Sequence, residues 1–347
     1  MSERLVPTAD TLAALGLSEA ELTPLESGLI NTTWLATLPG KAPCVLQAVN
    51  PIFPAAINAD IDIVTRHLER HGVTTPRLMP LPGGSLWLEA QDTVWRLLTF
   101  IAGDTFECLP GPDHAREAGA LLGRFHAALA DFNYDFVNAR LGVHDLDRHI
   151  GALRDALAMH TGHASFGAVE PLGAAILSLA ASLPALPQSP DRTVHGDPKI
   201  SNVIFAADSG KAICLIDLDT LSRMPLALEL GDALRSWCNP AGEDSATATL
   251  NTVLYRSALA GYAREAKLFI TEAEWRGFPA ATLRITVELA ARFCADALEE
   301  CYFGWDRDRF ASASAHNQAR AASQLHLAET IAAELARLEI ETERAFS

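Results

Sequence analysis

The sequence has few of the features that mark exported, membrane-spanning or zinc-binding proteins. Its six cysteines lie far apart along 347 residues without a CxxC pair, so reduced core thiols are favoured over disulfides or a zinc site. The N-terminal stretch MSERLVPTAD has no apolar segment of the kind that a secretory signal needs. No uninterrupted apolar run reaches the length that spans a bilayer. We therefore expect a cytoplasmic protein.

Positive charge is also scarce. The chain has 27 Lys and Arg residues against 43 Asp and Glu residues, which gives a formal net charge of −16. This balance argues against a nucleic-acid backbone or an anionic membrane surface as partner. It leaves neutral or cationic small-molecule substrates, and anionic ones that arrive with a metal ion. The oligomeric state is left open.

The first hundred residues have the pattern of a small sheet that carries one helix. Apolar and β-branched runs at 32–38 and 42–49 flank Pro39-Gly40-Lys41, and runs at 85–90 and 93–101 flank Gln91-Asp92. Both arrangements are typical of hairpins. Between them, residues 55–71 have helical spacing of apolar residues, with Pro54 and Gly72 as start and stop signals.

From about Asp113 the pattern becomes helical. Residues 116–132 are strongly amphipathic, and further helices are expected at 145–160, 171–183, 227–238, 245–266, 280–301 and 312–344. The one obvious strand region of this half lies around 194–220. We therefore predict an α+β fold with two lobes, a small antiparallel-sheet lobe at 1–101 and a larger, mostly helical lobe at 102–347.

The segment from Val194 to Thr220, VHGDPKISNVIFAADSGKAICLIDLDT, concentrates polar residues around a short hairpin. A buried carboxylate is costly unless a cation meets it. Mg²⁺ prefers one or two carboxylates plus phosphate oxygens, which suits Asn202 and Asp217. Phosphoryl transfer from ATP further needs a carboxylate that orients the attacking hydroxyl, and Asp197 has that position. HGD alone would fit a plain turn, but the spacing and the preceding sheet lobe favour a catalytic segment.

HGDPKISN followed by IDLDT resembles the aminoglycoside phosphotransferase and choline kinase superfamily, which has a protein-kinase-like fold. WRLLTFIAGDTFE resembles its hinge, and LGRFHAAL resembles its first large-lobe helix. More narrowly, LINTTWL, VLQAVNPIFP, GDALR and RFCADALEECYF together resemble the N-acetylhexosamine 1-kinase branch. The resemblance implies an ATP- and Mg²⁺-dependent enzyme that phosphorylates an alcohol, here the anomeric hydroxyl of an N-acetylhexosamine or related sugar.

The same resemblance implies a role for each site residue. Asp197 is expected to accept or orient the proton of the sugar hydroxyl, while Asn202 and Asp217 hold Mg²⁺. His195, Asp232 and Arg235 are expected to brace the catalytic loop. The remaining candidates are Gly28, Asn31, Thr32, Gln47, Thr99 and Ile101 for the nucleotide, and Asp219, Arg292, Asp296 and Tyr302 for the acceptor.

Two departures from the family pattern bear on the nucleotide. Kinase-like folds carry a lysine on the third strand, but the matching position in VLQAV is Gln47, which is neutral. We expect Lys199 to supply much of the missing charge, although a solvated lysine is the simpler alternative. The phosphate loop has a single glycine, Gly28, where several are usual. On the acceptor side, Arg292 and Asp296 could instead form a surface ion pair, since residues four apart share a helix face.

Three other functions stay open. An aminoglycoside kinase would suit the acidic chain, and a choline or homoserine kinase has the same fold. A pseudokinase that binds nucleotide without turnover is favoured by Gln47 and the glycine-poor loop, and disfavoured by the joint presence of Asp197, Asn202 and Asp217. A protein kinase is disfavoured, because the stretch from Asp217 to Asp232 is too short for an activation loop.

Overall fold

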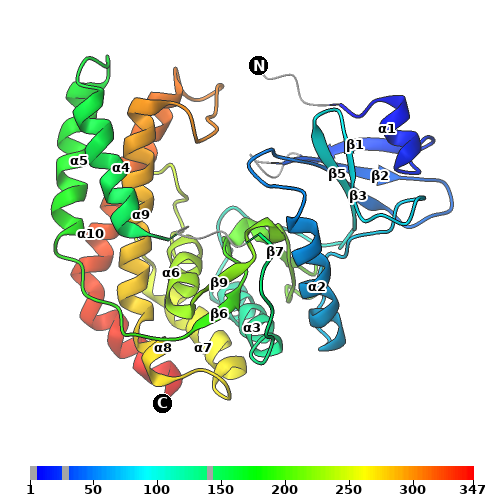
Figure 1. Cartoon of the computed structure of the whole chain (residues 1–347). Coiled ribbons are helices and arrows are strands. Elements are labelled where there is room, and N and C mark those ends of the chain that lie inside the picture. The colour runs from blue at the N-terminus through cyan, green and yellow to red at the C-terminus, as the bar shows by residue number, and fades with distance from the viewer. Residues whose placement is uncertain (1–5, 26–30, 139–143) are drawn as a thin grey trace.

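The computed structural model describes residues 6–25, 31–138 and 144–347, which form two lobes (Figure 1). The N-terminal lobe is an antiparallel sheet in the order β1-β2-β3-β5-β4, beside the short helix α1 (Ala9–Ala14). Its strands are β1 (Glu21–Leu25), β2 (Thr32–Thr37), β3 (Cys44–Val49), β4 (Leu88–Ala90) and β5 (Thr93–Thr99). Both predicted hairpins are present.

Alternation along the strands gives this sheet two different faces. Leu46 of β3 packs with Trp34 and Trp95 in a small core that the N-terminal lobe keeps to itself. Gln47, the next residue, therefore points to the opposite face. Its neighbours in register are Thr33 on β2 and Arg96 on β5, so a polar row crosses this face of the sheet.

Helix α2 (Ile57–Arg70) confirms the helix predicted at 55–71, but its packing was not foreseen. Its apolar residues Ile57, Ile61, Val64 and Leu68 join the large buried cluster of the second lobe rather than the core of the sheet. Figure 1 shows α2 lying between the sheet and the second lobe. The lobe boundary at residues 101–102 stays a prediction.

The second lobe is built around helix α9 (Phe278–Glu299), which contacts α10, α6, α4 and α5. In Figure 1, α4, α5, α9 and α10 lie side by side on the left. The other helices of this lobe are α3 (Pro112–Ala128), α4 (Leu146–Met159), α5 (Phe166–Ala180), α6 (Leu226–Trp237), α7 (Thr252–Ala266), α8 (Glu272–Arg276) and α10 (Ala313–Phe346).

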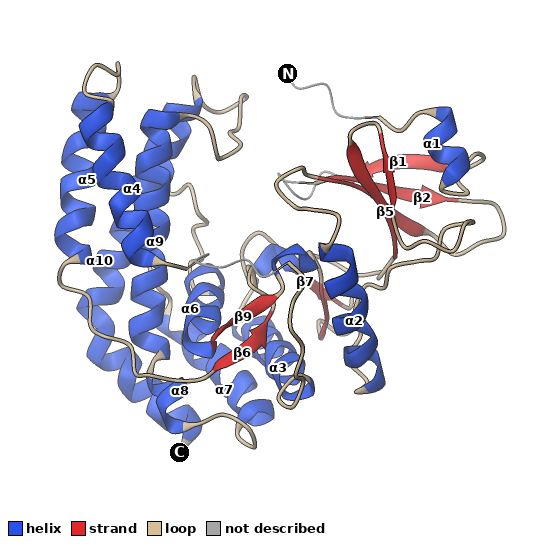
Figure 2. Ribbon diagram, viewed as in Figure 1, coloured by secondary structure: helices blue, strands red, loops and turns tan. Residues whose placement is uncertain are grey.

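Two small sheets hold the predicted catalytic segment (Figure 2). Strand β6 (Asp191–Val194) pairs with β9 (Ser222–Pro225), and β7 (Val203–Phe205) pairs with β8 (Ala212–Leu215). Single 3₁₀ turns, η1 (Ile200–Asn202) and η2 (Leu218–Thr220), precede β7 and follow β8. The prediction placed one hairpin here and missed the β6–β9 pair, because strands of four residues carry little periodic signal.

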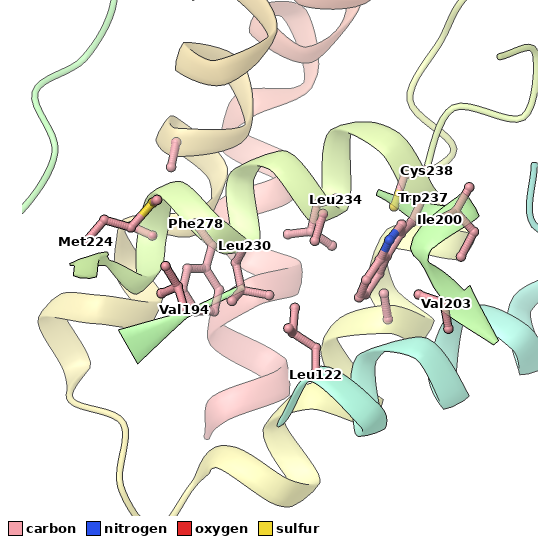
Figure 3. Packing of buried hydrophobic residues seen from close by; sticks show 14 of the residues in the cluster. Leu122, Val194, Ile200, Val203, Met224, Leu230, Leu234, Trp237, Cys238 and Phe278 are labelled. Atoms are coloured by element: carbon pink, nitrogen blue, oxygen red, sulfur yellow. The ribbon is translucent and has the colours of Figure 1, made fainter. Parts of the chain in front are cut away.

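Helix α6 packs against β6, β9 and the η1 turn. Figure 3 shows Leu230 and Leu234 of α6 pointing into the space between Val194 and Leu122, with Trp237 beside Val203. The indole N–H of Trp237 also donates to the carbonyl of Pro198, at 2.8 Å. The apolar face of α6 therefore sets the position of the loop that contains Asp197.

Two predicted helix starts were wrong. Helix α5 begins at Phe166, five residues before Pro171, so the proline lies inside the helix rather than at its start. Helix α7 begins at Thr252 and not at 245, because the Asn251 side chain caps it by accepting from the backbone N–H groups of Val253 and Leu254.

The six cysteines are all free, and the prediction of core thiols holds for four of them, since Cys108 is only partly buried and Cys301 is exposed. Over the described residues, none of the helices combines the length and the apolarity that crossing a membrane requires.

Candidate active site

A glycine turn fixes the loop that carries Asp197. Gly196 has a φ of +85°, and a Cβ at this position would lie 2.1 Å from the carbonyl oxygen of Thr220. Only glycine fits both conditions. The backbone N–H groups of His195 and Gly196 donate to the two carboxylate oxygens of Glu229 on α6, at 2.9 and 3.0 Å. Glu229 is fully buried, so this turn is held rigidly.

His195 links the loop to the end of β8. Its Nε2 lies 2.9 Å from the carbonyl oxygen of Ile216, and its Nδ1 accepts from the backbone N–H of Asp197 at 3.3 Å. Burial lowers the pKa of His195, so the ring is neutral and donates through Nε2. Both ring nitrogens are thus used in positioning Asp197, which matches the expected bracing role.

Asp197 lies where three polar groups meet. Its Oδ2 is 2.7 Å from Nζ of Lys199 and 3.2 Å from Nδ2 of Asn202, whose amide also donates to the Asp197 carbonyl at 2.9 Å. Burial alone would raise the pKa of Asp197, but the charge and the hydrogen bond of Lys199, together with the charge of Arg235, outweigh it and hold this pKa below its ordinary value. About a quarter of the side chain (26 %) remains exposed. The structure therefore presents an ionised carboxylate that a ligand can reach.

Asn202 and Asp217 meet the requirements for a divalent cation. The Asn202 nitrogen faces Asp197, so its amide oxygen is the atom left for a metal. Asp217 directly follows the hairpin in the left-handed conformation, with a φ of 65°. Burial, then the charge of Asp219, raises the pKa of Asp217 to about 7. A cation bound here would offset the crowding of carboxylates, so the donor set fits Mg²⁺.

Asp219 differs most from expectation. Residues 218–220 form a 3₁₀ turn and not a strand, so strand alternation does not place Asp219 on the same side as Asp217. Asp219 is 3 % exposed. One oxygen lies 2.7 Å from Nη1 of Arg96 and the other accepts from Nδ2 of Asn31 at 2.6 Å. Oδ1 has the ion pair with Arg96 but accepts no hydrogen bond within the described residues, and a contact of Asp219 with the acceptor stays a prediction.

Arg96 is the charged residue that the sequence interpretation missed. It is 1 % exposed, and its Nε and Nη2 both donate to Oε1 of Gln47, at 2.9 and 2.7 Å. Its Nη1 also donates to Oδ1 of Asn58 on α2, at 3.2 Å. A signal was present: an arginine in the middle of the apolar strand TVWRLLT is rarely buried without a specific partner.

The other nucleotide candidates have different surroundings. Gly28 lies outside the described residues. Asn31 accepts from the backbone N–H of Asn50 through its Oδ1, and Thr32 begins β2. The N–H of Thr99 donates to the carbonyl of Arg77 at 2.9 Å, so this group is already used within the protein. Ile101 lies in the connector after β5, where its backbone is outside any helix or strand.

Three of the four acceptor candidates, Arg292, Asp296 and Tyr302, lie at the C-terminal end of α9, apart from Asp219. The guanidinium of Arg292 lies 5.6 Å from the ring centre of Tyr302 and 5.5 Å from that of Phe303. Its Nη2 lies 3.4 Å from the Tyr302 hydroxyl, which places the two candidate side chains together. Tyr302 is 57 % exposed.

Asp296 stabilises the turn after α9 by accepting hydrogen bonds, rather than by the ion pair with Arg292 that was considered from the sequence. It is 2 % exposed, and its oxygens accept from the backbone N–H groups of Cys301, Tyr302 and Phe303 and from Nδ2 of Asn317. The four bonds range from 2.8 to 2.9 Å. Asp296 therefore shapes the turn that presents Tyr302, and a direct contact with the acceptor stays a prediction.

Buried polar groups continue from this turn toward the catalytic loop. His144 and Glu288 pair at 3.1 Å. Burial would lower the pKa of His144, but the hydrogen bond and charge of Glu288, with a smaller contribution from Asp232, outweigh it and raise this pKa. Asp232 in turn binds Arg235 at 2.8 Å, as expected for a brace. Within the described part of the chain, Nε2 of His144 and Oε2 of Glu288 are buried without a hydrogen-bond partner. Such atoms call for a ligand or ordered water.

A cavity of about 450 Å³ lies elsewhere, between the segment that follows α2, helices α3 and α7, and the β7–β8 hairpin. Its lining includes Gly72, Glu117, Arg124 and Lys211, and none of the predicted site residues. The site is therefore defined by its side chains and not by this cavity.

Comparisons with known proteins agree with the fold. Homoserine kinase from Cupriavidus metallidurans is 36 % identical over 66 residues, a match that spans only 19 % of this chain and 20 % of that protein. The structure of amicoumacin kinase with AMP-PNP, Ca²⁺ and Ami superposes with a TM-score of 0.58 at 13 % identity, over 93 % of this chain and 88 % of that one. An aminoglycoside phosphotransferase from Alicyclobacillus acidocaldarius has a TM-score of 0.56 at 17 % identity, over 99 % and 98 %.

At these identities the structural likeness establishes the protein-kinase-like fold, which confirms the predicted fold class. The family model described as APH, phosphotransferase enzyme family, matches residues 21–268, a span that contains the sheet, the catalytic loop and the β7–β8 hairpin. The chain belongs to the APH family of phosphotransferases.

Proposed function

We propose that this protein is an ATP-dependent kinase that phosphorylates the anomeric hydroxyl of an N-acetylhexosamine or a related sugar. The observation that carries the proposal is the meeting of Asp197, Lys199 and Asn202 on a rigid loop next to Asp217. A phosphoryl transfer requires a carboxylate for the hydroxyl and oxygen ligands for a metal beside it.

Asp197 orients the acceptor. Its ionised carboxylate is partly exposed, so a sugar hydroxyl can donate to it and point its oxygen at the γ-phosphate. Lys199 lies on the same loop and pairs with Asp197. Its ammonium group can therefore stabilise the negative charge that develops on the transferred phosphoryl group. Asn202 and Asp217 would hold Mg²⁺, and the bound ion would neutralise phosphate charge.

A polar, neutral acceptor agrees with the end of α9. Arg292 and Tyr302 offer hydrogen-bond donors, and the rings of Tyr302 and Phe303 offer an apolar surface for a sugar face. The unpaired polar atoms of His144 and Glu288 add a donor and an acceptor that hydroxyl groups would satisfy. The similarity to the hexosamine 1-kinase branch supports the same class of acceptor.

A homoserine-type acceptor is the second candidate. It is supported by the 66-residue similarity to homoserine kinase, although that stretch is a small part of either chain. The aminoglycoside phosphotransferase among the similar structures supports a third class, the aminoglycosides. AMP-PNP and Ca²⁺ in the amicoumacin kinase structure support nucleotide and divalent-cation use in this fold.

A substrate panel tests the proposal. The protein is incubated with Mg-ATP and N-acetylhexosamines, plain hexoses, homoserine, choline or kanamycin, and ADP formation is followed. We expect turnover with an N-acetylhexosamine and a product without a reducing end, because phosphate at the anomeric position blocks it.

Asp197→Asn serves as the control, since it keeps the shape of the loop but removes the carboxylate. We expect its kcat to fall by roughly 10²–10⁴-fold while Mg-ATP still binds. Phosphorylation of kanamycin or homoserine alone would overturn the sugar assignment. Nucleotide binding without turnover on any acceptor would support the pseudokinase.

A further inference from the structure

Arg96, a buried arginine on β5, lies opposite the β3 position at which kinase-like folds carry a lysine and this chain carries Gln47. Gln47 of β3 lies directly opposite Arg96 in the sheet, and Thr33 of β2 lies opposite Gln47 on its other side. Residues paired in register share one face of the sheet. The small core occupies the other face, so this row of three polar side chains turns toward α2 and the second lobe.

Arg96 fixes the orientation of the Gln47 amide. Two of its N–H groups converge on Oε1 of Gln47, at 2.9 and 2.7 Å, so this atom must be the amide oxygen. Nε2 of Gln47 is then the donor side, and it reaches Oγ1 of Thr33 at 3.3 Å. Thr33 follows Thr32 and Asn31, two of the residues proposed for the nucleotide.

The same arginine joins the two lobes. Its Nη1 lies 2.7 Å from Oδ1 of Asp219, which belongs to the turn after Asp217. The second oxygen of Asp219 accepts from Asn31 at 2.6 Å. Both side chains of the ion pair are about 2 % exposed or less, so the pair is shielded from solvent screening. Asn31 and Asp219 thus have their relative positions set by Arg96.

Charges are distributed differently here from the usual protein-kinase arrangement. In that arrangement a lysine on the third strand pairs with a glutamate of the small-lobe helix. In this chain Gln47 occupies the strand position, and the α2 residue that Arg96 binds is Asn58, another neutral amide. The cation and the carboxylate are instead Arg96 and Asp219.

We infer that Arg96 is the positioning residue for the nucleotide triphosphate. From its place on β5, it has the role that a lysine on the third strand has in other kinase-like folds. It holds the donor of Gln47 toward the nucleotide side, fixes Asn31 through Asp219, and supplies the positive charge that the third strand lacks. The inference rests on the proposed ATP-dependent function.

Moving the cation back to the third strand tests the inference. Binding of Mg-AMP-PNP is measured by calorimetry for the wild type, Arg96→Gln and the double variant Arg96→Gln with Gln47→Lys. Arg192→Gln is the matched control, since Arg192 also pairs with a buried carboxylate, Glu274, but in the helical lobe. Melting temperatures report on folding, and kcat and KM for ATP are measured with the acceptor found in the substrate panel.

We expect Arg96→Gln to raise the Kd for Mg-AMP-PNP at least roughly tenfold, since charge-assisted hydrogen bonds are lost. KM for ATP should rise with it, while KM for the acceptor changes little. The double variant should return the Kd to within about threefold of the wild type, because the charge is restored one strand away. A purely structural arginine would give no such rescue.

The outcomes separate the inference from the function. A wild type that does not bind Mg-AMP-PNP contradicts the proposed function itself. If the wild type binds, a Kd within about twofold for Arg96→Gln, or a folded double variant that binds no better than it, overturns the inference. If Arg96→Gln does not fold, Arg96→Lys replaces it: a Kd within about threefold supports the role of the charge, and a tenfold loss rejects it.

Discussion

Lys199 illustrates how one side chain serves two purposes in this site. Its ammonium group pairs with Asp197 at 2.7 Å and keeps that carboxylate ionised. Burial would lower the pKa of Lys199, but the charges of Asp197 and Asp217 outweigh it and raise this pKa, so the lysine stays charged over the physiological range. A bound nucleotide would offer the same ammonium a second anionic partner. Lys199 is therefore a residue for the transferring phosphate, while Arg96 acts on the nucleotide side.

Lys199→Ala tests this division. We expect kcat to fall by more than roughly tenfold, because a charge that stabilises the transition state is removed. The measurement is steady-state kinetics with varied ATP and acceptor. Lys211→Ala, at an exposed lysine before β8, is the control and should change kcat little. A kcat reduced less than tenfold in Lys199→Ala would reject the role on the phosphate.

The raised pKa of Asp217 leads us to expect that both protein stability and metal affinity depend on pH. Its pKa in the metal-free protein is raised to about 7, above the ordinary carboxyl value, by burial and by Asp219. A raised carboxyl pKa means that the folded state binds this proton more tightly than the unfolded state, so this group's contribution to stability falls as pH rises from about 4 to 7. Protonation also removes a metal ligand, so affinity for Mg-ATP should fall below pH 7.

Thermal melts of metal-free protein from pH 5 to 8 check the first part. The difference between wild type and Asp217→Asn should be largest at pH 8, where the variant is the more stable. Calorimetry with Mg-AMP-PNP over the same range checks the second part. A flat affinity between pH 5.5 and 8 would show that Asp217 is ionised throughout.

Helices α3 and α7 are held together through two glycines. A Cβ on Gly119 would lie 2.0 Å from the carbonyl oxygen of Ala258, and one on Gly261 would lie 1.9 Å from that of Arg116. The backbones of the two helices are thus in direct contact at these glycines, and a side chain at either position would force the helices apart. The pair carries His126, which lies 3.5 Å from Glu229 beneath the catalytic loop.

Gly119→Ala should therefore destabilise the protein by about 3 kcal/mol, because the helices must separate. Gly151→Ala is a matched control within α4, where a Cβ would meet nothing within 4 Å. It should stabilise by about 0.5–1 kcal/mol, since glycine costs entropy in a helix. Urea unfolding measures both changes. Equal effects at the two positions would refute the close approach.

The turn after α9 depends on one carboxylate. Asp296→Asn replaces an oxygen that accepts two hydrogen bonds by a donor, leaving buried N–H groups without partners and costing about 3 kcal/mol. Tyr302 should lose its fixed position, so KM for the acceptor should rise while KM for ATP is maintained. Glu299→Gln, at an exposed position on the same helix end, is the control. An unchanged KM for the acceptor would separate this turn from substrate binding.

The molecule as a whole has a small core in the sheet and a large core that includes α2, with the charged residues of the site between them. The Arg96–Asp219 pair and the Asn31–Asp219 bond cross from one lobe to the other. Nucleotide binding should reinforce these contacts, because the proposed ligand groups come from both lobes.

We therefore expect Mg-ATP at about a hundred times its Kd to stabilise the folded protein by ~2.7 kcal/mol, a rise of several degrees in melting temperature. Differential scanning fluorimetry with and without metal measures it. Asp217→Asn should show little of this rise, since the metal is then held poorly. An equal rise in that variant would place the metal elsewhere.

The sequence by itself determined most elements and the order of the catalytic residues. Helices such as α2 and α6 were predictable because apolar periodicity is a local property, and Gly196, Asp197 and Asn202 lie within one short segment. Interactions of Arg96, Asp219 and Asp296 were decided by the tertiary structure. Arg96 meets Gln47 because β5 pairs beside β3, and Asn31 meets Asp219 across 188 residues of chain. A sequence pattern indicates which residues face a core. The partner of a buried charge depends on which distant strands and turns lie side by side, and that is determined only by the tertiary structure.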